Sequence, residues 1–240
     1  MNRKYFLVFL VCTCMFLACL AACGNTEPTS VSVSEETSAQ ETVEEPEEEP
    51  PEEEAYSIDY LILVDGEHPL PEDWEENLQL EETTNSVGDV VRVEKKAYAA
   101  YQKLAEELSD EGIHVELDSA FRSVEEQQKI IDDFTEKYGA EYARTYAAVP
   151  GYSEHHTGLA LDLYLIVDGV TAYENEDLMK YPEVWAKIHE KLPKYGFILR
   201  YPGNTGYPYE PWHIRYVGEK AAKEITERGI SFEEYWRELD

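Results

Sequence analysis

The segment that decides how this 240-residue chain folds is Ser153-Glu154-His155-His156-Thr157-Gly158-Leu159-Ala160-Leu161-Asp162. Its second half begins an apolar run, residues 159–166, which predicts a buried strand, and Thr157-Gly158 predicts a turn before it. His155 and Asp162 are seven residues apart, and this odd separation would place them on opposite faces of one straight strand. The turn lets the His155 imidazole fold back towards the Asp162 carboxylate.

A second cluster, Glu210-Pro211-Trp212-His213, follows later in the chain. Imidazole and carboxylate are ligands suited to Zn²⁺, so we expect His155, Asp162 and His213 to bind a zinc ion. Three protein ligands leave a fourth position open for water, as catalytic zinc sites require. Glu210 precedes His213 by three residues, on a proline-rich loop, and is expected to act on that water as a base. The alternative is that the two histidines are unrelated surface or core residues.

Around these clusters the sequence predicts both helices and strands. Apolar residues spaced three to four apart favour helices, whereas short alternating or apolar runs favour strands. Ser123 is a good helix N-cap, and Glu126 completes a capping box with it. Helices are expected at 92–111, from Ser123 onward and at 183–195, and strands at 60–64, 113–117, 159–166, 197–201 and 212–217. Because the two kinds do not alternate strictly, we expect an α+β fold in which helices flank a small antiparallel sheet.

The cysteines and missing motifs exclude several kinds of enzyme. All four cysteines lie in the first 23 residues, so the rest of the chain has no disulfide, no Cys nucleophile and no thiolate ligand. No Ser is followed three residues later by Lys, and the helical zinc motif His-Glu-x-x-His is absent. A metal site in the folded part must therefore use histidines and carboxylates.

Residues 1–22 are predicted to be a lipoprotein signal peptide. Two basic residues precede an uncharged apolar stretch that ends in Leu20-Ala21-Ala22-Cys23. Small residues leading into a cysteine resemble a lipobox, in which Cys23 is lipidated, and two acyl chains give stable anchoring. We expect a lipid anchor in the membrane, with the domain on the extracytoplasmic face of the bacterial cell membrane. An uncleaved transmembrane anchor is the alternative, and the sequence leaves open whether an outer membrane is present.

Cys23 and the residues after it, 23–55, are expected to form a lipidated, disordered acidic linker. Residues 24–55 contain twelve Glu, no basic residue and no aromatic residue, so they cannot bury enough apolar surface to offset their ordering entropy. They suit either a spacer or a solubilising tail. The catalytic domain is predicted at 56–240. The whole chain has a formal net charge of −31, which argues against nucleic acid as a partner, because phosphates need a basic patch.

The patterns S-x-H-x-x-G-x-A-x-D and E-P-W-H-x-R resemble those of the VanY-type D-alanyl-D-alanine carboxypeptidases. These are zinc peptidases, related to the hedgehog/lysostaphin-like metallopeptidase fold, that cut the peptide stems of bacterial peptidoglycan. The resemblance covers roughly residues 58–217. It includes Ser119-Ala120-Phe121-Arg122-Ser123 with Gln127, which is similar to the family's arginine-bearing segment.

The resemblance implies a role for each site residue. The zinc ligands would be His155, Asp162 and His213, and the catalytic base Glu210. The residues implied to grip the terminal carboxylate of the substrate are Arg122, Gln127 and Ser153. Arginine also suits that task on physical grounds, because its planar fork binds a carboxylate through two hydrogen bonds. His156 stands where the family often has Gln, and we expect it behind the ligands or at the rim of the pocket.

The sequence thus predicts a monomeric zinc carboxypeptidase that hydrolyses the C-terminal peptide bond of peptidoglycan stem peptides and releases D-alanine. One alternative is an L,D-carboxypeptidase acting on tetrapeptide stems, whose catalytic residues would be the same. The other is a non-catalytic peptidoglycan-binding domain of the same fold, which would have no use for the base Glu210. The sequence does not separate a role in wall remodelling from one in glycopeptide resistance.

Overall fold

The computed structural model describes residues 58–172, 174–203 and 207–239. The predicted signal peptide, Cys23 and the predicted linker lie outside the described residues and stay predictions. Among the residues that are described, no helix is both long and apolar enough to cross a membrane.

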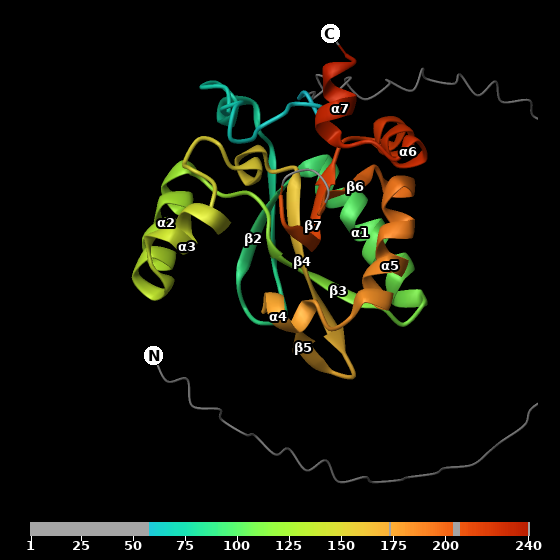
Figure 1. The fold of residues 1–240 in the computed structure, drawn as a ribbon. Coiled ribbons are helices and arrows are strands. Elements are labelled where there is room, and N and C mark those ends of the chain that lie inside the picture. Colours follow the sequence, from blue (N-terminus) through green and yellow to red (C-terminus); the bar gives the residue numbers. More distant parts are fainter. Residues whose placement is uncertain (1–57, 173, 204–206, 240) are drawn as a thin grey trace, which may run out of the picture. The chain divides into compact units, whose positions relative to one another are not determined.

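A five-stranded antiparallel sheet lies at the centre of the domain (Figure 1) and includes three of the predicted site residues, Asp162, Glu210 and His213. Four strands lie in the order β3-β4-β7-β6, and β5 pairs with the end of β4. The strands are β3 (His114–Ser119), β4 (Ala160–Val167), β5 (Val170–Ala172), β6 (Phe197–Pro202) and β7 (Tyr209–Tyr216). A separate hairpin consists of β1 (Leu80–Thr84) and β2 (Val90–Glu94).

Helices flank this sheet, which confirms the predicted α+β class. The α-helices are α1 (Lys95–Asp110), α2 (Val124–Tyr138), α3 (Ala140–Tyr146), α4 (Asn175–Leu178), α5 (Pro182–Lys191), α6 (Glu219–Arg228) and α7 (Phe232–Arg237). The 3₁₀ turns are η1 (Glu75–Asn77), η2 (Glu154–Thr157) and η3 (Leu192–Tyr195). Figure 1 shows the α2–α3 pair on the other side of β2 from α1 and α5. The capping box of Ser123 and Glu126 is present at the start of α2, as predicted.

The central strand β4 places a carboxylate inside an apolar framework. Its residues Leu161, Leu163 and Leu165 are fully buried in the main core, to which α1 and α5 also contribute. Asp162 interrupts this apolar run. In the register of the sheet, Asp162 lies opposite His213 of β7 on one side and Ser119 of β3 on the other. Burial of the neighbouring leucines therefore fixes where the Asp162 side chain points.

Two expected elements are wrong in detail. Residues 60–64 form no strand, because the carbonyl oxygens of Tyr60 and Ile62 accept hydrogen bonds from the Arg215 guanidinium, at 3.1 and 2.8 Å, instead of pairing with a strand. The helix expected at 92–111 begins only at Lys95. The residues before it form β2, in which the alternate valines Val91 and Val93 are buried. Val93 also fits the spacing of three to four residues that predicted the helix, so the period of two was not recognised.

The location of Glu210 also differs from the expectation. The sequence suggested a loop, but Glu210 lies within β7 and pairs with Tyr201 of β6. The β1–β2 hairpin was not expected at all. Its strands contain several Glu, Thr and Arg residues, so their alternation is weak.

Candidate metal centre

The structure brings the three predicted zinc ligands together. Ligand atoms of His155, Asp162 and His213 all lie within 4.8 Å of one another. His155 Nε2 is 3.1 Å from Asp162 Oδ2, and His213 Nδ1 is 3.0 Å from Asp162 Oδ1. The Asp162 carboxylate thus stands between the two imidazoles.

A tight turn returns His155 to Asp162. His155 lies in η2, and η2 is followed by Gly158, whose φ of 71° belongs to the left-handed region. A side chain at this position would also come within 3.3 Å of the Glu94 Cβ atom. The left-handed backbone conformation therefore favours glycine here, and the closeness of Glu94 leaves little room for a side chain. The turn predicted at Thr157-Gly158 is confirmed.

The two histidines present different ring nitrogens to Asp162. His155 donates from Nδ1 to the carbonyl oxygen of Ala120 at 2.7 Å, which leaves Nε2 facing the carboxylate. His213 turns the other way, because its Nε2 bonds to Glu154 Oε2 at 3.0 Å and its Nδ1 faces Asp162. Each ring is thus oriented by a hydrogen bond behind it, the usual arrangement for metal-binding histidines.

Three observations show that these residues fit a zinc ion. Two imidazole nitrogens and a carboxylate oxygen are a donor set that zinc prefers. Asp162 Oδ1 is buried and has no hydrogen-bond partner among the described residues, because the nearby His213 nitrogen is close but poorly aligned. Arg122 Nη2 lies 3.0 Å from both His155 Nε2 and Asp162 Oδ2, so positive charge is favoured at this point.

The charges of the three residues differ in an instructive way. Burial and the Arg122 guanidinium lower the pKa of His155 to about 4. Burial also acts against protonation of His213, but the carboxylates of Asp162 and Glu154 outweigh it and raise the pKa of His213 to about 9. Burial alone would raise the pKa of Asp162, yet the two histidines hold it well below its ordinary value. Asp162 therefore stays ionised.

Glu210 lies beside the three ligands without joining them. Its Oε2 is 3.9 Å from His213 Nδ1, and its side chain is 28% exposed. Burial raises the pKa of Glu210, with the Asp162 charge acting in the same direction and His213 against it. A carboxylate with a raised pKa accepts and returns a proton more readily near neutral pH. Its place and chemistry suit the predicted base.

Arg122 and Gln127 form a connected pair next to this group. Arg122 Nη1 donates to Gln127 Oε1 at 3.2 Å, and Arg122 Nε donates to Ser119 Oγ at 2.9 Å. The buried Gln127 amide in turn donates to the carbonyl oxygen of Ala148 at 2.9 Å. Ser153 is buried just before η2, and its hydroxyl makes no hydrogen bond to another described residue.

A cavity opens beside Arg122. Its volume is about 490 Å³, and it lies between β2, the end of β3 and the start of α2. Charged lining residues include Arg92, Asp118 and Lys129. Burial and the nearby Asp162 raise the pKa of Asp118 to about 6, although the guanidinium of Arg122 opposes the shift.

His156 lies behind the site and not at its rim. It is fully buried, its Nδ1 donates to the carbonyl oxygen of Arg122 at 2.7 Å, and its Nε2 accepts from the Gly151 N–H at 3.0 Å. The ring is therefore neutral and protonated on Nδ1, in agreement with the lowering of its pKa by burial. His156 fixes the backbone of the residue predicted to grip the substrate.

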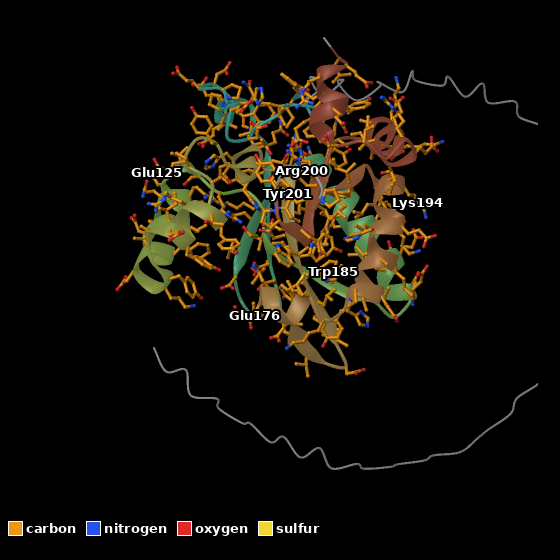
Figure 2. The ribbon with its side chains drawn as sticks, viewed as in Figure 1. Glu125, Glu176, Trp185, Lys194, Arg200 and Tyr201 are labelled. Carbon is orange, nitrogen blue, oxygen red and sulfur yellow. The ribbon has the colours of Figure 1, made fainter. Side chains whose placement is uncertain are left out.

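Sequence reasoning missed the buried carboxylate of Glu154 and the two arginines around it. Glu154 Oε1 accepts from Arg200 Nε and Arg215 Nη1, both at 2.8 Å. Burial would raise the pKa of Glu154, but the two guanidinium groups hold it well below its usual range. Figure 2 shows Arg200 near the middle of the domain, far from the peripheral Lys194. The available signals were Arg200 inside the apolar strand β6 and Arg215 as the last residue of the E-P-W-H-x-R pattern in β7.

Comparisons with known proteins agree with this geometry. Residues 90–219 match the protein family described as VanY, D-alanyl-D-alanine carboxypeptidase. A D-alanyl-D-alanine carboxypeptidase of Enterococcus faecalis is 35% identical over 188 residues. That match covers 73% of this chain and 65% of the relative, so the chain spans slightly less than two thirds of the relative's length.

Two solved structures are similar as well. One is a zinc complex of a mutant of the vancomycin-resistance D,D-pentapeptidase VanY from a VanB-type cassette. It is 33% identical, covers 73% of this chain and 98% of that chain, and has a TM-score of 0.59. The other is the LD-carboxypeptidase LdcB, at 31% identity, 74% of this chain, 86% of that chain and a TM-score of 0.61. The zinc in the first structure agrees with the prediction of Zn²⁺ as cofactor.

Proposed function

The chain is an enzyme of the VanY family of D-alanyl-D-alanine carboxypeptidases, and we propose that it hydrolyses the C-terminal peptide bond of peptidoglycan stem peptides with the help of zinc. The product would be free D-alanine. The observation that carries the proposal is the convergence of His155, Asp162 and His213 beside Glu210 and Arg122.

In this mechanism, metal binding and proton transfer are carried out by different residues of the chain. Zinc, held by His155, Asp162 and His213, would supply Lewis-acid polarisation of the scissile carbonyl and of the attacking water. Glu210 accepts a proton from that water on its carboxylate and then returns it to the leaving amine. Its raised pKa suits both transfers.

Arg122 binds the terminal carboxylate of the substrate. It lies next to the ligand atoms, and Gln127 and Ser119 hold its guanidinium in position. A free terminal carboxylate exists only at the end of a stem, so this arginine favours an exopeptidase over an endopeptidase. The cavity of about 490 Å³ beside Arg122 gives room for part of the substrate.

The similar structures include both a D,D- and an L,D-acting enzyme. We therefore propose D,D-cleavage of pentapeptide stems as the main reaction and L,D-cleavage of tetrapeptide stems as the second candidate. The proposed site of action is the extracytoplasmic face of the cell membrane, with a lipid anchor on Cys23. The proposed form is a monomer. These last points rest on the sequence.

The decisive experiment combines defined stems with a variant of the base. Wild-type protein is incubated with pentapeptide and tetrapeptide stems, with and without a chelator, and released D-alanine is measured. Glu210→Gln should keep zinc but lose roughly 10²- to 10⁴-fold in kcat, because it cannot transfer the proton. Glu227→Gln, on the exposed face of α6, is the matched control and should change nothing. D-alanine release that survives the chelator, or full activity of Glu210→Gln, would refute the proposal.

A further inference from the structure

We propose that Glu154 is a positioning residue that sets the tautomer of His213, so that the Nδ1 lone pair of His213 points at the metal. The inference rests on the proposed binding of zinc by His213. Nothing in the sequence patterns assigned a role to Glu154. The proposed role of Glu154 follows from the hydrogen-bond partners of its two carboxylate oxygens.

The two oxygens of Glu154 have different neighbours. Oε1 accepts from Arg200 and Arg215, and Oε2 lies 3.0 Å from His213 Nε2. An ionised carboxylate only accepts hydrogen bonds, so His213 must carry a proton on Nε2. The Nδ1 atom, which faces Asp162, is then free of a proton whenever the ring is neutral.

The surroundings prevent this arrangement from relaxing. Glu154, Arg200, Arg215 and His213 are each at most 4% exposed. Arg215 is fixed on its far side by the carbonyl oxygens of the 60–62 segment. Arg200 Nη2 lies 2.7 Å from Glu233 Oε1 of α7, an ion pair that is close but not aligned for a hydrogen bond. Two guanidinium groups thus hold Glu154 from one side, and its other oxygen can only face His213.

This arrangement makes a sharp prediction for Glu154→Gln, a change that hardly alters the volume. An amide has one accepting and one donating end. The two arginines can only donate, so they take the amide oxygen and leave the NH₂ group facing His213 Nε2. His213 must then accept at Nε2 and carry its proton on Nδ1, the atom that the metal needs.

Zinc affinity tests the proposal directly. Dissociation constants are measured on the full chain by competition with a chromogenic chelator. Glu154→Gln should bind zinc about 10- to 100-fold more weakly, the range seen for groups that orient metal-binding histidines. Glu94→Gln is the matched control. Glu94 is also fully buried but caps α1, and a Gln oxygen can still accept the Ala97 N–H, so zinc affinity should not change. A folded Glu154→Gln protein with wild-type zinc affinity would overturn the proposal.

A second measurement needs no variant and so does not depend on folding of Glu154→Gln. Nitrogen-15 NMR of labelled histidines distinguishes a protonated, a free and a metal-bound ring nitrogen. In the zinc-loaded wild type, His213 should be protonated on Nε2 and metal-bound through Nδ1, and His155 should show the reverse. Metal binding through Nε2 of His213 would overturn the proposal. Failure to release D-alanine from any stem, with these signals present, would refute only the proposed function.

Discussion

His155 and His213 are the same residue type with the same proposed task, yet their surroundings differ. An uncharged backbone carbonyl accepts a hydrogen bond from His155, while burial and the Arg122 guanidinium lower the pKa of His155 to about 4. A buried carboxylate, that of Glu154, lies behind His213, and Asp162 and Glu154 together raise the pKa of His213 to about 9. The group behind each imidazole therefore sets which nitrogen faces Asp162, whereas burial and the charged groups around the ring set how strongly it attracts a proton.

The residues next to His155 also differ in kind from those next to His213. His155 borders Arg122, the residue proposed to bind substrate, whereas His213 backs onto the network of Glu154, Arg200 and Arg215. Buried charges of that network compensate one another, and removing one partner leaves the others unpaired. Changes on the His213 side should therefore affect metal binding most, and changes near Arg122 should affect substrate binding.

The largest expected effect comes from the residue that both histidines share. Asp162 contacts His155 through Oδ2 and His213 through Oδ1. Asp162→Ala removes a ligand and the anchor of both rings, so zinc affinity should fall by more than the roughly 100-fold upper range for an orienting group. The measurement is zinc content after dialysis, with Glu227→Gln as control. Stoichiometric zinc in Asp162→Ala would mean that His155 and His213 do not share this carboxylate at the metal centre.

The pH dependence of stability should separate the two histidines in zinc-free protein. The pKa of His155 is lowered, so the unfolded chain binds its proton first, and stability is lost as pH falls from about 6.5 towards 4. The pKa of His213 is raised, so its stabilisation is present below pH 6.5 and is lost as pH rises towards 9. Each effect should be on the order of 3 kcal/mol.

Urea unfolding between pH 4 and 9, in the presence of a chelator, checks this prediction. Compared with wild type, His155→Gln should flatten the acid side of the plot of unfolding free energy against pH. His213→Gln should flatten the alkaline side of the same plot. Each variant serves as the control for the other. Equal changes on both sides for either variant would show that the two rings do not titrate independently.

The smallest expected effect lies at the outer end of the network. Glu233→Gln in α7 weakens the ion pair with Arg200 but leaves Arg200 and Arg215 bonded to Glu154. Zinc affinity should change by less than the roughly 10-fold minimum expected for Glu154→Gln. The same chelator competition measures it. A larger loss would show that α7 helps to position His213 through Arg200.

Local patterns predicted much of this architecture. The seven-residue separation of His155 and Asp162 indicated a turn between them, the Thr157-Gly158 pair marked that turn, and Ser123 with Glu126 marked the start of α2. These features depend on neighbouring residues, so one sequence is enough to reveal them. The β1–β2 hairpin was missed because the polar residues of its strands weaken their alternation, and the loop at 60–64 was missed because its carbonyl oxygens bond to the distant Arg215.

The sequence by itself determined the residue types available to the site, the strand that carries Asp162 and the glycine turn before it, because residue type, strand period and turn chemistry are local properties. Only the tertiary structure decided which nitrogen each histidine presents. The partner that orients His155 lies 35 residues away at Ala120, and the partner that orients His213 lies 59 residues away at Glu154. A hydrogen bond to a distant segment forms only when the chain packs, so no local pattern can specify it.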